Sequence, residues 1–316
     1  MFKNVRCLVT GGSGMIGRAV CQLLYRQGAI VTDASLQIQS GVFPWNVYQI
    51  DLTDQLACQR LFASIFPQMV FHLAGIPKSV ASTSESAKLF TSMLQMNLNV
   101  LACCVAPRIT HVLFTSSIGA YASSEIFKEG IGDDTEPMDG FPAWCKRIGE
   151  KHIQALRLQC PNTHFSIVRP CNIYGPGSTS DMFIPSFMTK IKHFLSTHEP
   201  VEIWGDGSSV RDFLFSEDCA EGIMLAMQYG TQTSQAKYLN LGSGNGVTIK
   251  NLVQTMYDIC PFEYFFNVEK PSGFPKRVMD MSLATSHLGF IPKTSLQEGL
   301  KKTWQDYLDS CEEKKT

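Results

Sequence analysis

The 316-residue sequence has little net charge and no long hydrophobic run. Its 27 basic and 28 acidic residues nearly cancel, and the basic residues are scattered along the chain. A nucleic-acid-binding surface, which needs clustered positive charge, is therefore not predicted. No apolar stretch reaches the roughly 18 residues that span a bilayer, so no membrane segment is predicted either.

Paired-cysteine motifs are also missing. The chain contains eleven cysteines, yet none are spaced as C-x-x-C, and the adjacent Cys103 and Cys104 suit neither a zinc site nor an easy disulfide. The N-terminus enters a strand pattern with no secretory signal before it. We therefore expect reduced thiols, a cytoplasmic protein and no bound metal.

What the sequence does contain, up to residue 170, is an alternation of short apolar strands and amphipathic helices. The predicted strands are 5–10, 29–34, 47–50, 67–75, 111–117 and 164–170, and the predicted helices include 15–27, 51–66 and 86–106. Such alternation predicts an α/β fold with a parallel sheet covered on both faces. The rhythm breaks after Pro170, which predicts a first domain of residues 1–170 and a smaller mixed domain of 171–316. We expect some later segments, about 205–245, to return to the first domain.

A glycine-rich turn joins the first predicted strand to the first predicted helix. Gly11, Gly14 and Gly17 are spaced three residues apart in "TGGSGMIG". In this context the first glycine permits a tight turn, the second allows close approach of a pyrophosphate, and the third allows close packing of helix and sheet. The free N–H groups of the helix N-terminus then face the phosphates. The turn predicts a dinucleotide-binding, Rossmann-type doubly wound domain.

The choice between NAD and NADP depends on the residues after the second strand. Asp33 is the candidate for binding the ribose hydroxyls, although it comes slightly early after Gly28, and an ordinary loop carboxylate is an equally good interpretation. No Lys or Arg follows the strand to meet a 2′-phosphate, and the one cation that comes close to the glycine turn is Arg18, directly after it. The pattern favours NAD, with NADP possible.

Eight motifs occur in a fixed order along nearly the whole chain. They are "TGGSGMIG", "DLTD", "HLAG", "FTSSIGAY", "WCKRIGE", "RPCNIYGPG", "WGDGSSVRDFLFSED" and "LNLGSG". With them the chain resembles the extended short-chain dehydrogenase/reductases, and more narrowly the NAD-dependent nucleotide-sugar epimerase/dehydratase family. The resemblance implies a Rossmann domain, a C-terminal domain that binds a nucleoside-diphosphate sugar, and a homodimer formed through two helices per subunit. The helix at 87–106 and the helix of Lys146 fit such a dimer, but both are equally well explained as helices covered by their own chain.

The resemblance also implies roles for individual residues. Asp51 and Leu52 would lie near the adenine, and Lys146 would bond the nicotinamide ribose. The other implied dinucleotide-binding residues are Gly11, Ser13, Gly14, Met15, Ile16, Gly17, Leu73, Ala74 and Gly75.

The implied catalytic serine is Ser117, four residues before Tyr121, and the implied substrate-binding residues are Asn172, Arg211 and Arg277. Each has a simpler interpretation, since a serine can cap a strand end and an arginine can be a surface charge. In a neutral chain with few cations, an arginine pair is a reasonable clamp for a diphosphate.

One expected group is missing from this pattern. The family places a proton-exchanging tyrosine four residues before the lysine, where this chain has Pro142. Three hypotheses remain. Another group does the work, with Tyr121 completing a set with Ser117 and Lys146, or with Cys145 or a held water in its place. Alternatively, the protein binds its ligands without redox chemistry. Finally, a tyrosine from elsewhere could fill the place. The coherence of the other motifs favours the first.

The loop after Ser117 narrows the reaction that the resemblance implies. Sugar 4,6-dehydratases have an Asp-Glu pair there, but Ile118 and Gly119 follow in this chain. GDP-fucose synthases use a cysteine in this loop and a histidine before an Ile-Pro pair, where this chain has Gly119 and Met182. A C4 epimerase or keto-sugar reductase remains, in a setting such as cell-envelope polysaccharide synthesis. The alternative is a non-catalytic regulator or partner subunit that binds dinucleotide and nucleotide sugar.

Overall fold

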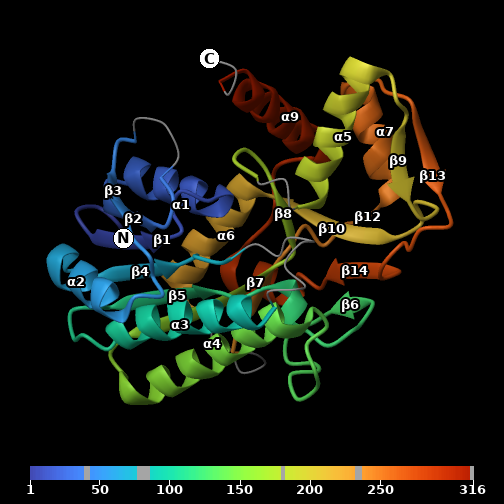
Figure 1. The fold of residues 1–316 in the computed structure, drawn as a ribbon. Helices are drawn as coiled ribbons and strands as arrows, with labels where there is room; N and C mark the ends of the chain where they lie inside the picture. The colour runs from blue at the N-terminus through green and yellow to red at the C-terminus, as the bar shows by residue number, and fades with distance from the viewer. Residues whose placement is uncertain (39–42, 77–85, 179–181, 232–236, 314–316) are drawn as a thin grey trace.

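The computed structural model describes residues 1–38, 43–76, 86–178, 182–231 and 237–313. Its larger part is built on a parallel sheet of seven strands, arranged in the order β11-β7-β5-β4-β1-β2-β3 (Figure 1). The strands are β1 (Arg6–Thr10), β2 (Ile30–Ser35), β3 (Asn46–Gln49), β4 (Met69–His72), β5 (His111–Thr115), β7 (His164–Pro170) and β11 (Leu239–Leu241). The chain thus starts in the middle of the sheet and winds outward in both directions, which brings the carboxyl ends of β1, β4 and β5 to one edge.

Helices cover both faces of this sheet. Helices α1 and α6 pack together on one face, while α3 contacts both α2 and α4 on the other (Figure 1). Their bounds are α1 (Met15–Arg26), α2 (Gln55–Ile65), α3 (Ser86–Cys103), α4 (Gly140–Gln159) and α6 (Ser216–Tyr229). The predicted fold class, a doubly wound parallel sheet with a smaller mixed part, is confirmed.

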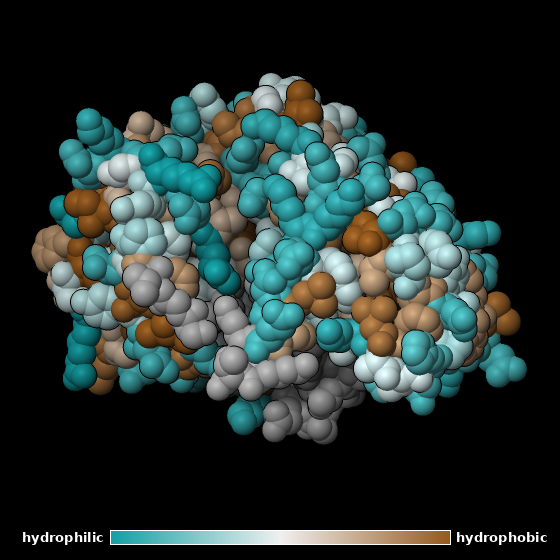
Figure 2. Space-filling model, turned by 90° about the horizontal axis from the view of Figure 1, so that it is seen from above, coloured by the Kyte–Doolittle hydropathy of each residue, from teal (hydrophilic) through white to brown (hydrophobic). Residues whose placement is uncertain are grey.

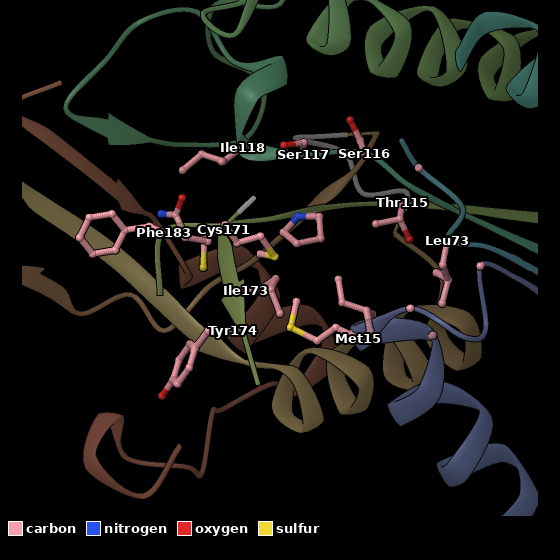
Figure 3. A pocket seen from close by; sticks show the side chains of 18 of the residues that line it. Met15, Leu73, Thr115, Ser116, Ser117, Ile118, Cys171, Ile173, Tyr174 and Phe183 are labelled. Carbon is pink, nitrogen blue, oxygen red and sulfur yellow. The ribbon is translucent and has the colours of Figure 1, made fainter. Parts of the chain in front are cut away.

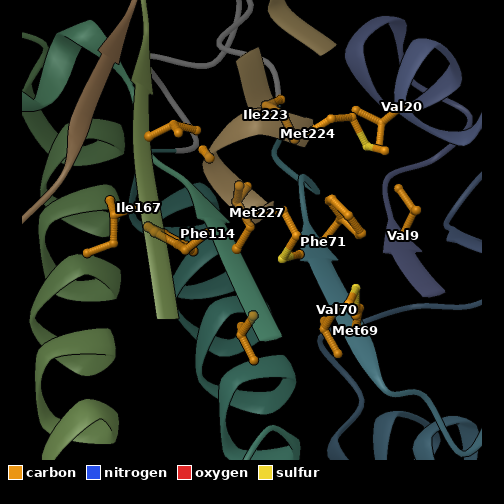
Figure 4. Packing of buried hydrophobic residues seen from close by; sticks show 14 of the residues in the cluster. Val9, Val20, Met69, Val70, Phe71, Phe114, Ile167, Ile223, Met224 and Met227 are labelled. Carbon is orange, nitrogen blue, oxygen red and sulfur yellow. The ribbon is translucent and has the colours of Figure 1, made fainter. Parts of the chain in front are cut away.

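The main core lies between the sheet and its helices. Figure 4 shows Met224 and Met227 of α6 facing Phe71 of β4 and Phe114 of β5. These four side chains are at most 5% exposed. Buried strands of a parallel sheet need such near-continuous apolar runs, because helices cover both of their faces.

The smaller part has its own sheets and its own core. A five-stranded mixed sheet contains β6 (Ile126–Phe127), β8 (Asn172–Tyr174), β10 (Val210–Phe215), β12 (Gly246–Thr248) and β14 (Lys276–Met279). A two-stranded sheet joins β9 (Val201–Trp204) to β13 (Tyr264–Asn267). Three helices share the second core, namely α5 (Phe183–Thr197), α7 (Ile249–Ile259) and α9 (Leu296–Glu313).

Three segments cross the sequence division at residue 170. The strand β6 comes from the first part of the chain, but it pairs with β14 in the mixed sheet. The strand β11 and helix α6 come later in the chain, but they belong to the large sheet and its covering layer, and α8 (Ser282–Leu288) packs against both. The two parts are therefore interleaved rather than strung end to end.

The described residues include no helix that is both long enough and apolar enough to cross a membrane. On the face seen in Figure 2, hydrophobic residues are scattered among hydrophilic ones. All eleven cysteines are unpaired.

Candidate functional site

A cavity of about 660 Å³ lies where the two parts meet, at the carboxyl edge of the large sheet (Figure 3). The large sheet and its helices contribute Gly11, Gly14, Met15, Ile16, Gly17, Leu73, Gly75, Ile76, Thr115, Ser116, Ser117, Ile118, Asp139 and Lys146. The segment after β7 and the smaller part contribute Cys171, Asn172, Ile173, Tyr174, Gly177, Met182, Phe183, Ile184, Pro185, Phe213 and Arg277, with Pro170 at the boundary. Figure 3 shows Ser117 and Ile118 on one wall and Met15 on the opposite wall.

The glycine turn is shaped by close backbone contacts. A Cβ on Gly17 would lie 2.0 Å from the carbonyl oxygen of Gly11, and a Cβ on Gly11 would lie 2.8 Å from Cα of Ala74. Gly11 also has a φ of 73°, which side chains disfavour. The loop therefore lies directly against the start of α1 and the end of β4. Helix α1 begins directly after this loop, at the cavity, and no side chain of the described residues caps the N–H groups at its start.

Asp33 supports this loop from below and does not line the cavity. It lies inside β2, is 2% exposed, and accepts a hydrogen bond of 2.6 Å from the Ser35 hydroxyl. Ser35 in turn accepts one from the Ser13 backbone N–H at 3.1 Å. Burial raises the pKa of Asp33, while its hydrogen bonds with Ser35 and with the backbone of Gly12 and Ser13 oppose the rise. The residue at the very end of the strand is thus Ser35, which the sequence analysis did not single out.

The other predicted dinucleotide residues divide into two groups. Leu73 and Gly75 line the cavity, and the backbone N–H of Ala74 is bonded to the Thr10 hydroxyl at 3.3 Å. Asp51 and Leu52 lie outside the cavity lining. Asp51 caps its own turn, because its carboxylate accepts hydrogen bonds from the backbone and hydroxyl of Thr53.

Ser117 lies at the end of β5, at the start of the short 3₁₀ turn η2 (Ile118–Ala120). Its Oγ accepts a 3.1 Å hydrogen bond from the Gly119 backbone N–H and lines the cavity. The hydroxyl proton is not used by that bond, so Ser117 keeps a donor for a ligand oxygen.

Lys146 enters the cavity from α4. Its Nζ donates to the Thr115 carbonyl oxygen at 2.7 Å and lies 5.3 Å from the centre of the Phe114 ring. Burial lowers the pKa of Lys146 from 10.5 to about 8. The amine therefore titrates within the range where general acids and bases work.

A buried hydrogen-bond chain fixes the lysine helix against the sheet. Nδ1 of His72 meets the Thr10 hydroxyl at 2.7 Å, and its Nε2 meets the Asn97 side-chain oxygen at 3.0 Å. Asn97 then donates to the carbonyl oxygen of Cys145 at 3.3 Å. Burial, followed by the charge of Lys146, lowers the pKa of His72 to about 3, so the imidazole is neutral. These hydrogen bonds therefore hold the helix of Lys146 in place without adding a charge.

Pro142 fits where it stands for a structural reason. It is the third residue of α4, which begins at Gly140 after the N-cap residue Asp139. Proline is tolerated in the first turn, because the N–H groups there have no partner within the helix. Compared with the expected tyrosine, Pro142 lacks a side-chain hydroxyl, and it also lacks the backbone N–H group.

The structure does not bring Tyr121 or Cys145 to the cavity lining. The Tyr121 hydroxyl donates to the Asn240 side-chain oxygen at 2.7 Å, and the residue is 2% exposed. Burial raises the pKa of Tyr121 well above its usual value. The Cys145 thiol is aimed at the Phe90 carbonyl, and burial raises its pKa to about 11. Neither placement favours proton exchange with a ligand.

No other tyrosine of the described chain replaces the missing one. Tyr174 is the one tyrosine among the described lining residues. Its hydroxyl points toward α9, where it lies 3.4 Å from the Leu296 carbonyl oxygen, and Figure 3 shows it directed away from Ser117. The hypothesis of a tyrosine supplied from elsewhere therefore has no support in the described residues.

The predicted substrate residues lie on the smaller part's side of the cavity. Asn172 lines the cavity and donates to the Asp212 carbonyl oxygen at 2.9 Å. Arg211 and Arg277 are partners in the β10–β14 register, but only Arg277 is among the described lining residues. Burial, and next the charge of Arg277, lower the pKa of Arg211. The two guanidinium groups thus form one positive region.

Asp139 is a cavity residue that was not among those predicted from the sequence. Its carboxylate lines the cavity and pairs with Arg277, at 3.0 Å between Oδ1 and Nη2. A signal was available, since an Asp followed by Gly-Phe-Pro at a helix start predicts an N-cap residue. That signal predicts the cap but not the ion pair across 138 residues.

The cavity fits a dinucleotide on two grounds. The glycine turn is a cradle that a Cβ would obstruct. In addition, the hydroxyls of Thr115 and Ser116, at the end of β5 beside Lys146, are buried and have no hydrogen-bond partner among the residues that the structure describes. Buried polar groups are rarely left without a partner, so these hydroxyls indicate a place where a bound group completes the structure.

Comparison with known proteins gives a consistent result. The model of the NAD dependent epimerase/dehydratase family matches residues 7–242. GDP-L-fucose synthase 1 from Arabidopsis thaliana is 28% identical over 97% of this chain and 94% of its own length. GDP-L-fucose synthase from Escherichia coli is 24% identical over 98% of both chains.

Solved structures show the same fold. UDP-glucose 4-epimerase from Thermotoga maritima with UDP-glucose has a TM-score of 0.84 at 24% identity, covering 96% of this chain and 99% of its own. UDP-glucose 4-epimerase from Thermus thermophilus in complex with NAD has a TM-score of 0.81 at 22% identity, with the same coverage.

Proposed function

Because the chain belongs to the NAD dependent epimerase/dehydratase family, we propose that it acts on a nucleoside-diphosphate sugar with a nicotinamide dinucleotide. The reaction is C4 epimerisation or reduction of a keto sugar. This proposal rests on the observation that a single cavity is lined by the glycine turn, by Ser117 and Lys146, and by Asn172 and Arg277. Relatives named GDP-L-fucose synthase and neighbours named UDP-glucose 4-epimerase support the substrate class.

The dinucleotide would lie against the large sheet, with its pyrophosphate at the glycine turn and the start of α1. Gly11, Gly14 and Gly17 leave room for it, and the α1 N-terminus favours its charge. The nucleotide sugar would reach across to Asn172 and Arg277. NAD is the cofactor that the family favours. NADP stays open, because β2 ends at Ser35 with no carboxylate facing the cavity.

Lys146 is the proton-exchanging group in this proposal. Its pKa of about 8 provides both a neutral amine and an ammonium near neutral pH. A bound nicotinamide supplies or accepts the hydride. Lys146 takes the proton of a sugar hydroxyl, directly or through one water, and returns a proton in the reverse direction. Ser117 donates a hydrogen bond to the same sugar oxygen and orients it.

Tyr121 has no role in proton transfer here, which changes the set predicted from the sequence. Its hydroxyl is committed to Asn240, and its ring lies 4.3 Å from the buried Arg169 guanidinium. Arg169 is also bonded to Glu150 at 2.8 and 2.7 Å. Tyr121 thus belongs to the buried structure beneath the Ser117 turn.

A second candidate function is non-catalytic binding of dinucleotide and nucleotide sugar. Pro142 favours it, because no described tyrosine hydroxyl takes the missing position. The two candidate functions differ in one measurable property, which is whether hydride is transferred between the bound sugar and the bound dinucleotide.

A homodimer is part of the proposal. Phe141, Trp144 and Ile148 form an exposed apolar row on α4, and Leu158 on the same helix is 87% exposed. Rows of this kind mark helix faces that pack against a partner. We expect Ile148→Asp to convert a dimer to a monomer in analytical ultracentrifugation, while Ile291→Asp, at another exposed isoleucine, leaves the dimer intact.

The unpaired thiols suit the reducing cytoplasm.

Native mass spectrometry of the freshly purified protein tests the proposed function first. Retained NAD indicates a cycle that regenerates its own cofactor, as epimerisation does. An empty protein that takes up NADH or NADPH on addition indicates a reductase with an exchanging cofactor. Failure to bind any dinucleotide would overturn the enzyme proposal and leave the glycine turn without a ligand.

A further inference from the structure

Asp139 is the N-cap residue of α4, but its carboxylate makes no capping hydrogen bond. An N-cap carboxylate ordinarily accepts from the backbone N–H of the second or third helical residue. The third residue of α4 is Pro142, which has no N–H. The substitution that removes the family tyrosine therefore also removes one of the two usual partners of Asp139.

The carboxylate instead turns into the cavity and binds Arg277. The two nitrogen–oxygen distances are 3.0 and 3.4 Å, and the Arg277 side chain is 12% exposed. Gly119 leaves the room for this conformation, because a Cβ there would lie 2.5 Å from Oδ2 of Asp139. Asp139 is the only carboxylate among the described residues that line the cavity.

Arg277 has the features of an anion site that its own chain has filled. It is next to Arg211 in the β10–β14 register, so two positive charges lie side by side. Its guanidinium lies 3.9 Å from the centre of the Phe274 ring, which holds it in place. Its Nε is buried and has no hydrogen-bond partner within the described part of the chain. An arginine so placed has donors left for a phosphate oxygen.

We propose that the Asp139 carboxylate occupies the anion position of Arg277 in the free protein and that the diphosphate of the substrate displaces it. This inference rests on the proposed function, because it takes a nucleoside diphosphate as the ligand of the cavity. Gly119 leaves room for the internal ion pair, and Pro142 removes one backbone donor that would compete for the carboxylate. A ligand must therefore carry enough negative charge to compete with the Asp139 carboxylate for Arg277.

Displacement lowers affinity in a predictable way. The ligand must break the Asp139–Arg277 pair and then lie near a carboxylate of like charge. Replacing Asp139 with Asn keeps the shape of the side chain but removes its charge. We expect Asp139→Asn to bind UDP or GDP about fivefold to tenfold more tightly than the unaltered chain does. The corresponding nucleosides, which carry no phosphate, should bind equally to both.

Isothermal titration with UDP and with GDP tests this proposal. Asp134→Asn is the matched control, because Asp134 is exposed, lies five residues away, and loses the same charge. A gain in affinity for Asp139→Asn but not for Asp134→Asn supports the proposal. Equal affinities for the two variants, or weaker binding by Asp139→Asn, would overturn it.

Two further variants locate the effect. In an Arg277→Met background the Asp139→Asn substitution should lose most of its effect, since the partner that it releases is gone and only the repulsion between carboxylate and ligand remains. Pro142→Ala restores the N–H that Asp139 can cap, and should tighten diphosphate binding in the same direction but by less. An effect of Asp139→Asn that persists undiminished without Arg277, or a Pro142→Ala protein identical to the parent, contradicts the mechanism. Failure of the parent and all variants to bind either nucleotide would instead contradict the proposed function.

Discussion

The side of the cavity proposed to bind the dinucleotide (residues 11–17 and 73–75) is shaped by backbone, whereas the side proposed to bind the sugar (residues 117, 118, 139, 172 and 277) is shaped by side chains. On the first side a single Cβ at Gly17 meets the Gly11 carbonyl oxygen at 2.0 Å. On the second side Pro142 replaces the expected tyrosine, and the helix start still forms.

This difference shows where the chain can change its chemistry. A backbone cradle has few alternative sequences, because only glycine leaves the required space. A side-chain wall can exchange one group for another while the fold persists. Asp139 lies on that second wall, with Gly119 against its carboxylate and Pro142 three residues further along the chain, and at Gly119 and Pro142 the chain departs from the family pattern.

The largest expected effect is on the dinucleotide side. Gly17→Ala forces a methyl group against the Gly11 carbonyl, so it should lower the free energy of unfolding by about 2–3 kcal/mol and abolish dinucleotide binding. Thermal unfolding and titration with NAD measure the two effects. Gly14→Ala is the control for stability, because its methyl group would lie 3.3 Å from the same oxygen at an ordinary φ. Equal stability losses in both variants would contradict the backbone argument.

On the sugar side, Lys146→Met should reduce turnover by about 10²–10⁴-fold, the usual contribution of an acid–base group. With a series of nucleotide sugars, reductase turnover is followed by nicotinamide absorbance, and epimerase turnover, which regenerates its cofactor, is followed by chromatography of the sugars. Lys151→Met is the matched control, since Lys151 is exposed on the same helix and lines no part of the cavity. A Lys146→Met enzyme with ordinary turnover would rule out the lysine as the proton carrier.

Ser117→Ala should have a smaller effect, because it removes one orienting hydrogen bond and no charge. We expect turnover to fall about tenfold to a hundredfold with dinucleotide affinity unchanged. Ser123→Ala, at an exposed serine that follows the same turn, should match the parent. If affinity and turnover fell together, Ser117 would be a structural cap.

The smallest effect on chemistry is expected at Tyr121. Tyr121→Phe leaves the side-chain oxygen of Asn240 without its buried donor, which should lower stability by about 1–3 kcal/mol. Turnover at a temperature well below unfolding should not change. A loss of turnover in a folded Tyr121→Phe protein would restore the tyrosine to the acid–base set and contradict its placement beneath the turn.

Much of the fold was predictable because its signals are local. The glycine turn, the strand–helix alternation and the ordered motifs predict the doubly wound sheet and the family, and both predictions are confirmed. The family is NAD dependent, which confirms the predicted class of cofactor. By contrast, β6 joins the smaller sheet through pairing with β14, a contact between distant segments that no local pattern signals.

The site was less predictable for the same reason. Tyr121 lies four residues after Ser117, so sequence distance places it at the site, but its hydroxyl bonds to Asn240 on the far side of the turn. Asp33 lies inside the predicted second strand. Because side chains alternate in direction along a strand, its carboxylate lies under the glycine turn and does not line the cavity. The Asp139–Arg277 pair joins two parts of the fold, and only the tertiary structure brings its members together.

The most direct test of the account is the pH dependence of hydride transfer, measured in both directions with the nucleotide sugar that the enzyme accepts. Oxidation needs the neutral amine of Lys146, so its rate should rise as pH rises through about 8. Reduction needs the ammonium form, so its rate should fall over the same interval. Such opposed profiles, absent in Lys146→Met, are the predicted result. No hydride transfer on either side of that pH, with dinucleotide and nucleotide sugar both bound, would contradict the account and make the protein a non-catalytic binder.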